Sequence, residues 1–295
     1  MLTTLKEVLA DARARRYAVP AFDCVEDVMV RAILETAEAR KAPVVMMCLE
    51  PDLRGNGWVY VPGLIKAAAA HHNVPVVLHL DHADNLELIR RAIDGGFTSV
   101  MIDGSSLPFE ENVRLTRTAV EMAHPRGISV EGELGHVGGM DLEATLRRDS
   151  VLTEPDEVAR FVEQTGVDAL AVSIGTSHGV YQSLPNLNIE RLKELHAAST
   201  VPLVLHGGSG TPEDQIRNAV RHGICKLNIY ADCRIALGRG LHKSAASQRR
   251  EDPLPQEVFG PIKDAVADVV AEKIALLCAA GRARNGNKPG AYCRR

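Results

Sequence analysis

The sequence predicts a single α/β domain with the (β/α)8 TIM-barrel fold, and three observations support this prediction. Short apolar runs alternate with amphipathic segments along the whole chain, there are eight such pairs, and no linker-like stretch divides them. This alternation is typical of parallel strands that are covered by helices on both faces of the sheet. Eight units within about 250 residues favour a closed barrel, because a doubly wound sheet usually contains fewer strands.

The predicted strands are short apolar runs, many of them rich in Val, Ile and Leu. Such runs are typical of strands that are buried on both faces. We expect them at residues 18–22, 43–49, 75–80, 99–102, 128–133, 169–174, 202–207 and 225–230.

Between the strands, apolar residues recur at spacings of three and four, which is the pattern of amphipathic helices. It predicts helices over residues 27–40, 85–96, 154–166, 188–199 and 211–223. Asp84 and Thr211 are the expected N-caps. An extra C-terminal helix over residues 262–278 would pack outside the barrel. We therefore expect one barrel domain over residues 1–282, followed by a basic, flexible tail at 283–295.

Composition limits the partners and the location of the protein. Charged residues make up 24% of the chain and the formal net charge is -4, so no overall basic field would attract nucleic acid. We expect no membrane segment, because no apolar run approaches the ~20 residues that span a bilayer. The N-terminus lacks the pattern of a signal peptide. The six cysteines include no CxxC pair, so we expect reduced thiols in a cytoplasmic protein.

Polar side chains follow nearly every predicted strand. Active sites of TIM barrels lie at the carboxyl ends of the strands, so these side chains would meet at one end of the barrel. Charged groups near a packed barrel mouth must be paired or must bind a ligand. The strand ends therefore predict a functional site, and they carry Asp23, Glu50, Asp81, His82, Asp103, Glu133, His178, His206 and Asn228.

Three of these residues, His82, His178 and His206, are histidines from three different strand ends. One histidine at a strand end is commonly a hydrogen-bonded structural residue. Three that the barrel brings together favour a metal, because three imidazoles and an open position are typical of a catalytic zinc site. Asp103 and Glu133 are either an N-cap and a buried ion-pair partner or oxygen ligands for a second metal position, and we favour the second interpretation.

Four motifs carry a resemblance to a known family. They are "LHLDHADNLELIRRAIDGG", "VEGELGHVGG", "LAVSIGTSHGVY" and "PLVLHGGSGTPEDQIRNAVRHGICKLNI". These motifs resemble the class II, metal-dependent fructose-bisphosphate and tagatose-bisphosphate aldolases, in the family's order and over residues 3 to 282. The resemblance implies an aldehyde-lyase that cleaves a sugar phosphate and assembles as a homodimer or homotetramer.

The resemblance also implies roles for individual residues. His82, His178 and His206 would hold a catalytic Zn²⁺, and Asp103 and Glu133 match the carboxylates of a second divalent position. Asp81 matches the proton donor at the hydroxyl of the cleaved bond. Substrate loops that bind a phosphate and a monovalent cation would include Gly179, Gly207, Gly208, Ser209 and Asn228, and Arg234 matches an arginine that binds the far phosphate.

The chemistry of aldol cleavage agrees with this assignment. Cleavage leaves a carbanion next to a carbonyl, so it needs an electron sink, which is either a lysine Schiff base or a Lewis-acidic metal. Zinc would stabilise the enediolate while Asp81 moves the hydroxyl proton. Lys226 is the only lysine in a predicted strand, and a Schiff-base role requires that its face of the strand point inward.

A base must also act on the donor carbon. The family uses a carboxylate on a mobile loop after the fifth strand, which here reads "GHVGGMDLEATLRRDSV". Asp141 is the candidate base, Glu143 is the reserve, and a disordered acidic loop is the alternative. Gly138 and Gly139 would supply hinge freedom.

The substrate side departs from the family pattern. Asp23 stands where the family usually has asparagine, Glu50 lies where a serine is typical, and Gln182 replaces a lysine. Tyr230 and Ala231 replace residues of a run that often ends in threonine. Carboxylates repel a phosphate and accept hydrogen bonds from hydroxyls, so the donor half of the substrate is expected to differ from dihydroxyacetone phosphate or to bind weakly if phosphorylated.

The sequence thus predicts a metal-dependent class II aldolase that acts on a ketose phosphate or a related sugar. Two alternatives remain open. One is a non-catalytic partner subunit of sugar catabolism that has kept the fold. The other is a different metal-dependent lyase or isomerase that uses the enediolate without breaking a carbon–carbon bond.

Overall fold

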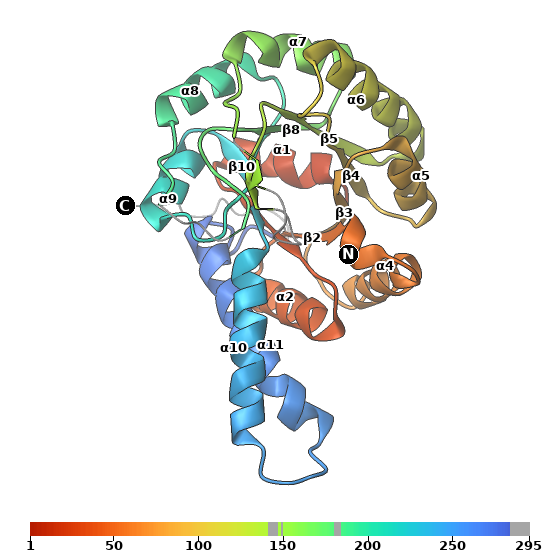
Figure 1. The fold of residues 1–295 in the computed structure, drawn as a ribbon, viewed down its shortest axis with the longest axis vertical. Helices are drawn as coiled ribbons and strands as arrows, with labels where there is room; N and C mark the ends of the chain where they lie inside the picture. The colour runs from red at the N-terminus through yellow and green to blue at the C-terminus, as the bar shows by residue number, and fades with distance from the viewer. Residues whose placement is uncertain (141–146, 149, 180–183, 284–295) are drawn as a thin grey trace.

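The computed structural model describes residues 1–140, 147–148, 150–179 and 184–283. It confirms the barrel, because eight parallel strands close in the order β1-β10-β9-β8-β5-β4-β3-β2 (Figure 1). Each observed strand begins within two residues of the start of a predicted strand. The strands are β1 (Val19–Asp23), β2 (Val44–Leu49), β3 (Val76–Ala83), β4 (Ser99–Ile102), β5 (Ser129–Leu134), β8 (Ala169–Val172), β9 (Leu203–Leu205) and β10 (Ile224–Ile229).

Helices follow the strands and form the outer layer of the barrel (Figure 1). The helices that follow the first seven barrel strands are α2 (Asp27–Arg40), α3 (Glu50–Leu53), α4 (Gly57–Ala69), α5 (Leu86–Asp94), α6 (Phe109–Ala123), α7 (Pro155–Thr165), α8 (Ile189–Ala198) and α9 (Glu213–Arg221). A 3-10 turn, η1 (His124–Arg126), follows α6, and two short antiparallel strands, β6 (Gly139–Met140) and β7 (Arg147–Arg148), lie after β5.

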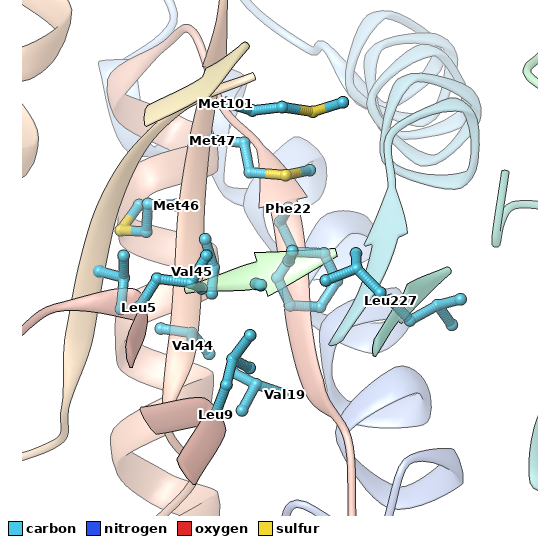
Figure 2. Packing of buried hydrophobic residues seen from close by; sticks show 14 of the residues in the cluster. Leu5, Leu9, Val19, Phe22, Val44, Val45, Met46, Met47, Met101 and Leu227 are labelled. Carbon is cyan, nitrogen blue, oxygen red and sulfur yellow. The ribbon is translucent and has the colours of Figure 1, made fainter. Parts of the chain in front are cut away.

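The amino end of the chain closes one end of the barrel. Helix α1 (Leu5–Arg15) is capped by Thr4, whose hydroxyl accepts from the backbone N–H of Glu7 in a capping box. Leu5 and Leu9 on its buried face belong to the same apolar cluster as Val19 of β1 (Figure 2). Because α1 packs against β1, β5, β8 and β10, it covers the amino ends of the strands and leaves the carboxyl ends as the mouth.

The last two helices extend away from the barrel as a projecting arm (Figure 1). The arm consists of α10 (Ala231–Ser247) and α11 (Pro255–Leu276), which pack along each other. Helix α11 confirms the predicted C-terminal helix and begins seven residues earlier than expected, with Pro255 in its first turn. The predicted basic tail lies almost entirely outside the described residues.

Two predicted helix caps are wrong by one residue. Asn85, not Asp84, caps α5, and its side chain accepts from the backbone N–H groups of Glu87 and Leu88. Pro212, not Thr211, precedes α9, and the Thr211 hydroxyl donates to the carbonyl of Gly207 instead.

Strand β3 is irregular at its carboxyl end. Its pairing with β4 shifts register between Leu80 and Ala83, and His82 has a φ of 46°, in the left-handed region that non-glycine residues rarely adopt. Regular alternation would turn Asp81 and His82 to opposite faces of the strand. A bulge re-aims a side chain, so this irregularity allows both residues to reach the barrel mouth.

Two expectations from composition can be compared with the structure. Among the described helices, none combines the length and the apolar character that crossing a membrane requires. Cys24, Cys48, Cys225 and Cys233 are buried free thiols, as expected. Cys278 is disulfide-bonded, so the expectation of reduced thiols is wrong for this residue.

Candidate metal centre

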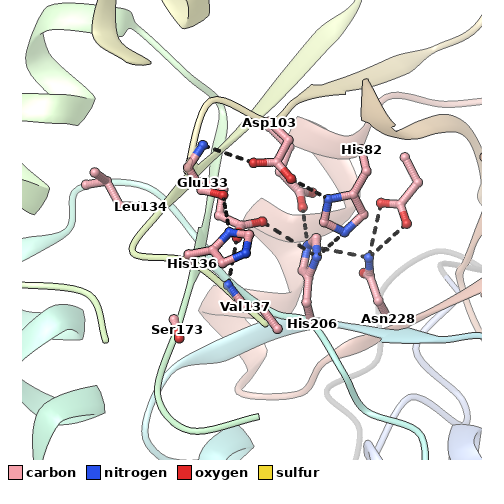
Figure 3. A network of polar contacts seen from close by, with 12 residues as sticks. His82, Asp103, Glu133, Leu134, His136, Val137, Ser173, His206 and Asn228 are labelled. Carbon is pink, nitrogen blue, oxygen red and sulfur yellow. Dashed lines mark hydrogen bonds and ion pairs between the residues drawn. The ribbon is translucent and has the colours of Figure 1, made fainter. Parts of the chain in front are cut away.

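The structure brings His82, His178 and His206 together at the barrel mouth. His82 comes from the irregular end of β3, His178 from the segment after β8 and His206 from the residue after β9. One nitrogen of each ring lies within 4.8 Å of one nitrogen of each other ring. The Nδ1 of His206 lies 2.8 Å from the Nε2 of His82 (Figure 3). The three rings therefore converge on one point, as the sequence predicted.

Each ring is oriented by a further contact outside the cluster. Asp103 Oδ2 lies 2.8 Å from Nδ1 of His82, and Glu131 Oε1 lies 3.0 Å from Nε2 of His206 (Figure 3). His178 forms a hydrogen bond with the backbone of Val137, and its buried Nε2 has no partner among the described residues. A buried nitrogen without a partner fits a metal ligand, because buried polar atoms are otherwise hydrogen-bonded.

The pKa values of the three imidazoles differ. Burial disfavours the charged form of all three, but Asp81 and Asp103 outweigh this effect at His82 and raise its pKa to about 10. Burial and the charge of His82 lower the pKa of His178 to about 4 and the pKa of His206 well below its ordinary value. The rings of His178 and His206 are thus neutral near pH 7, and the neutral imidazole is the form that binds metals. The carboxylates of Asp81 and Asp103 favour a positive charge nearby, as their effect on His82 shows.

Asp103 and Glu133 lie beside His82, and the three residues form a second group with ligand atoms within 4.8 Å of one another. Burial works against ionisation of Asp103, but the hydrogen bond and charge of His82 lower its pKa overall. Burial and the Asp103 charge raise the pKa of Glu133 to about 8. Glu133 Oε1 accepts from the backbone N–H of Val137, and its buried Oε2 lacks a hydrogen-bonding partner in the described part of the chain.

Asp81 lies next to the cluster and is almost fully buried. The side-chain amide of Asn228 on β10 donates to its two carboxylate oxygens, at 3.1 and 3.4 Å (Figure 3). The structure therefore brings Asp81 and Asn228 together beside His206, whose Nε2 is 3.4 Å from the same amide nitrogen.

The predicted substrate loops surround this group. Gly207 has a φ of 68°, and a Cβ atom there would collide with the backbone of Ser177. Ser209 caps the start of α10, because its Oγ accepts from the backbone N–H groups of Tyr230 and Asp232, both at 3.2 Å. The backbone N–H of Gly208 donates to the carbonyl of Asn228. Gly179 directly follows His178, and Ala231 is the first residue of α10.

Three acidic residues lie on the predicted substrate side. Asp23 is buried at the end of β1, and its Oδ1 has no hydrogen-bonding partner among the described residues. Burial, then Asp81 and Asp52, raise its pKa well above the ordinary value. Glu50 forms an ion pair with Arg54, at 3.6 Å on the half-exposed α3. Asp52 Oδ2 accepts from the Tyr230 hydroxyl at 3.0 Å.

Arg234 is exposed, and its guanidinium lies over the Tyr230 ring at 5.4 Å from the centroid. Asp141, Glu143 and Gln182 lie outside the described residues, so their predicted roles remain predictions. Gly139 of the preceding segment packs against the backbone of His178, and His178 N–H donates to the Gly138 carbonyl at 2.8 Å.

Several residues around the centre were not predicted as site residues, although Lys226 was considered for a Schiff-base role. Glu131 and Lys226 form a fully buried ion pair inside the barrel, and His79 lies between Asp81 and Glu131 at 3.8 and 4.0 Å. Each of these three residues precedes a predicted site residue by two positions on the same strand. Period-two alternation could have found them, whereas no simple pattern indicates Asp52.

A closed barrel whose mouth gathers three imidazoles and several carboxylates defines a barrel enzyme with a site that can hold a divalent metal. The chain matches the family model described as fructose-bisphosphate aldolase class-II over residues 3–282. It belongs to this family, and it is therefore an aldehyde-lyase.

Individual relatives agree with this assignment. The chain is 38% identical to a fructose-bisphosphate aldolase of Giardia intestinalis, over 96% of this chain and 94% of that protein. The crystal structure of the YdjI aldolase from Escherichia coli K12 is similar with a TM-score of 0.86 and 34% identity, over 96% of this chain and 100% of that one. A putative fructose-1,6-biphosphate aldolase from Coccidioides immitis has a TM-score of 0.84 and 28% identity, over 94% and 97% of the two chains.

Proposed function

We propose that this protein is a zinc-dependent aldolase of the cytoplasm that cleaves a ketose phosphate, or a related sugar, by a reversible retro-aldol reaction. The observation that carries this proposal is the convergence of His82, His178 and His206 beside the buried carboxylate of Asp81. Three imidazoles with an open position suit catalytic zinc. The Nε2 of His178 and the Oε2 of Glu133, which have no hydrogen-bonding partner in the described part of the chain, support the fit of a cation.

In this proposal the three histidines hold the metal, which supplies the electron sink that an enediolate requires. A Schiff base is disfavoured, because Lys226 faces inward but its ammonium is held by Glu131 at 3.0 and 3.2 Å with no exposure to substrate. Asp81 takes the proton from the hydroxyl next to the cleaved bond and returns it in the reverse reaction. The Asn228 amide orients Asp81 for this transfer.

The base that acts on the donor carbon is proposed to be Asp141, with Glu143 as the reserve. The segment that leads to it is anchored beside the centre, since Gly138 and Gly139 pack against His178. Asp103 and Glu133, together with His82, are proposed to provide a second position for a divalent ion. Gly179, Gly207, Gly208 and Ser209 are proposed to bind a phosphate of the substrate, with a monovalent cation nearby.

The donor half of the substrate is proposed to differ from dihydroxyacetone phosphate. Asp23 and Asp52 bring two carboxyl groups to the substrate side, and Asp23 Oδ1, which has no hydrogen-bonding partner among the described residues, can accept from a substrate hydroxyl. Charge-assisted bonds to phosphate contribute about 1.5–3 kcal/mol each, and both the serine and the lysine that would supply such bonds are replaced. Glu50 is also proposed to contact the substrate, from a position beside Arg54.

A substrate panel tests these proposals. Zinc-loaded protein would be assayed with fructose 1,6-bisphosphate, with singly phosphorylated ketoses and with free ketoses, each with and without a chelator. We expect chelator-sensitive release of an aldehyde, which a carbonyl reagent traps, from a substrate whose donor end is not phosphorylated. Ordinary efficiency on fructose 1,6-bisphosphate would refute the donor proposal, and substrate turnover without trapped aldehyde would favour an isomerase.

We also propose that the protein forms a homodimer or homotetramer through the projecting arm. The arm and the segment that joins its helices expose three large apolar side chains by 44–50%, namely Leu241 of α10, Leu254 at the N-cap of α11 and Phe259 of α11. Exposed apolar surface is typical of an interface with another chain. Light scattering coupled to gel filtration would give the mass, and a monomer at micromolar concentration would contradict the proposal.

A further inference from the structure

A buried ion pair lies beside the histidine cluster, inside the barrel. Lys226 of β10 donates to both carboxylate oxygens of Glu131 on β5, at 3.2 and 3.0 Å, and both side chains are 0% exposed. β8 and β9 separate the two strands, so the pair crosses the barrel interior. The proposed reaction uses neither residue, and its role is therefore open.

Stability alone does not explain a charged pair at this depth. Two charges must leave water, and an apolar pair of similar volume is often equally stable or more stable. Barrel interiors are usually filled by branched aliphatic side chains. The register neighbours of the pair are apolar, since Val204 lies beside Lys226 and Met101 lies beside Glu131.

The Glu131 carboxylate also fixes the protonation of a cluster histidine. Its Oε1 lies 3.0 Å from Nε2 of His206, and a carboxylate can only accept, so Nε2 carries the proton. The lone pair of Nδ1 then faces into the cluster, 2.8 Å from Nε2 of His82. Asp103 likewise contacts the outer ring nitrogen of His82, Nδ1, at 2.8 Å, and the other nitrogen of that ring, Nε2, faces the cluster.

Lys226 holds the Glu131 carboxylate in position. Its ammonium contacts both carboxylate oxygens, at 3.2 and 3.0 Å, and one of these oxygens also faces Nε2 of His206. The ion pair thus directs an acceptor at the outer nitrogen of the ring, and the inner nitrogen, Nδ1, remains directed into the cluster.

We propose that Glu131 and Lys226 are positioning residues, which select the His206 tautomer that presents Nδ1 to the metal. This inference rests on the proposed function, because it requires that the cluster hold zinc. Carboxylates behind a metal-bound histidine typically change metal affinity by about 10- to 100-fold when they are removed.

The test compares zinc affinity in three proteins by competition with a chromogenic chelator. The double variant E131L/K226M removes both charges and keeps an apolar interior of similar volume, so it is expected to fold and to bind zinc about 10- to 100-fold more weakly. The variant E131Q/K226M keeps an acceptor for the His206 N–H and should recover part of this loss. A purely structural pair would predict equal zinc affinity in all three proteins.

A matched control separates zinc affinity from stability. Lys273 and Asp232 form another partly buried ion pair, at 2.9 Å, on the two arm helices. The variant D232N/K273M should lower the melting temperature and leave zinc affinity within about threefold of the unmodified protein, since this pair contacts none of the three histidines.

The outcomes distinguish the two proposals. If the unmodified protein binds zinc and E131L/K226M binds it equally well, the positioning role is wrong and the aldolase proposal stands. If the unmodified protein binds no zinc, the aldolase proposal itself fails. Should E131L/K226M not fold, two-bond ¹H–¹⁵N spectra of the zinc-loaded unmodified protein decide, because the inference requires His206 to be protonated on Nε2, and protonation on Nδ1 overturns it.

Discussion

Asp81 is held beside the histidine cluster by burial and by a single side-chain amide. Its side chain is 3% exposed, and Asn228 donates to both oxygens, so its orientation is fixed beside the cluster. Asp84, three positions later, is exposed and lies outside the cluster. The two aspartates therefore allow one chemical change to be compared in two environments.

We predict that D81N lowers kcat for cleavage by about 10²- to 10⁴-fold, because an amide of the same shape cannot take the hydroxyl proton. Zinc affinity should stay within about threefold, since Asp81 is not one of the three histidine ligands. The control D84N should leave kcat within about twofold. Steady-state kinetics and zinc titration measure both effects, and a D81N rate within tenfold of the unmodified protein would contradict the proposed role.

At the residue scale, the sequence indicated the strand-end residues that the structure brings together, and it did not indicate the ion pair that lies deeper in the barrel. His82, Asp103, Glu133 and His206 follow apolar runs, and that position alone marks them. Glu131 and Lys226 lie within apolar runs, so their inward direction depends on the strand register, which a single sequence does not reveal. Asp52 reaches Tyr230 through the short helix α3, whose orientation comes from tertiary packing.

At the scale of elements, the barrel strands were predictable and the helix ends less so. Buried parallel strands are near-continuous apolar runs, and this composition marks most of the eight, whereas β5 reads SVEGEL and contains two glutamates. Helix caps depend on which of two neighbouring polar residues turns toward the backbone. Asp84 and Asn85 are adjacent and both suit an N-cap, and only the backbone conformation, with Asn85 at φ -152° and ψ 160°, decides between them.

Helix α5 directly follows the strand that carries Asp81 and His82, so its cap affects the stability of this region. N85A removes the acceptor of two backbone N–H groups, at 3.0 and 3.1 Å. We expect a loss of about 1 kcal/mol and a fall in melting temperature of about 2 °C.

Asn56 is the matched control for this cap, because it precedes α4 without a side-chain hydrogen bond to the helix. N56A should change the melting temperature by less than half as much as N85A. Thermal unfolding followed by circular dichroism measures both variants, and equal shifts would show that the Asn85 cap contributes nothing specific.

At the scale of the whole molecule, the barrel assembles its centre from residues that are distant along the chain. His82, His178 and His206 span 124 positions between the first and the last, and α1 closes the opposite end of the barrel. Because folding creates the cluster, a metal that binds it stabilises the folded state over the unfolded chain.

Zinc at about 100 times its dissociation constant should therefore add about 2.7 kcal/mol to the free energy of unfolding. We predict that a chelator lowers the melting temperature and that added zinc restores it. H178A, which removes one ring of the cluster, should lose most of this response. Calorimetry with and without chelator measures the effect, and a melting temperature that is independent of zinc would count against the metal centre.

The left-handed backbone at His82 restricts how this centre can change in evolution or design. Of the side chains that commonly ligate metals, histidine and aspartate tolerate a positive φ best, while branched residues such as threonine do not. In the proposed metal centre, an exchange of one ligand for an oxygen donor, which would shift preference toward harder ions, is therefore easiest as H82D. The backbone at this position thus favours one route by which the proposed centre could change its metal preference.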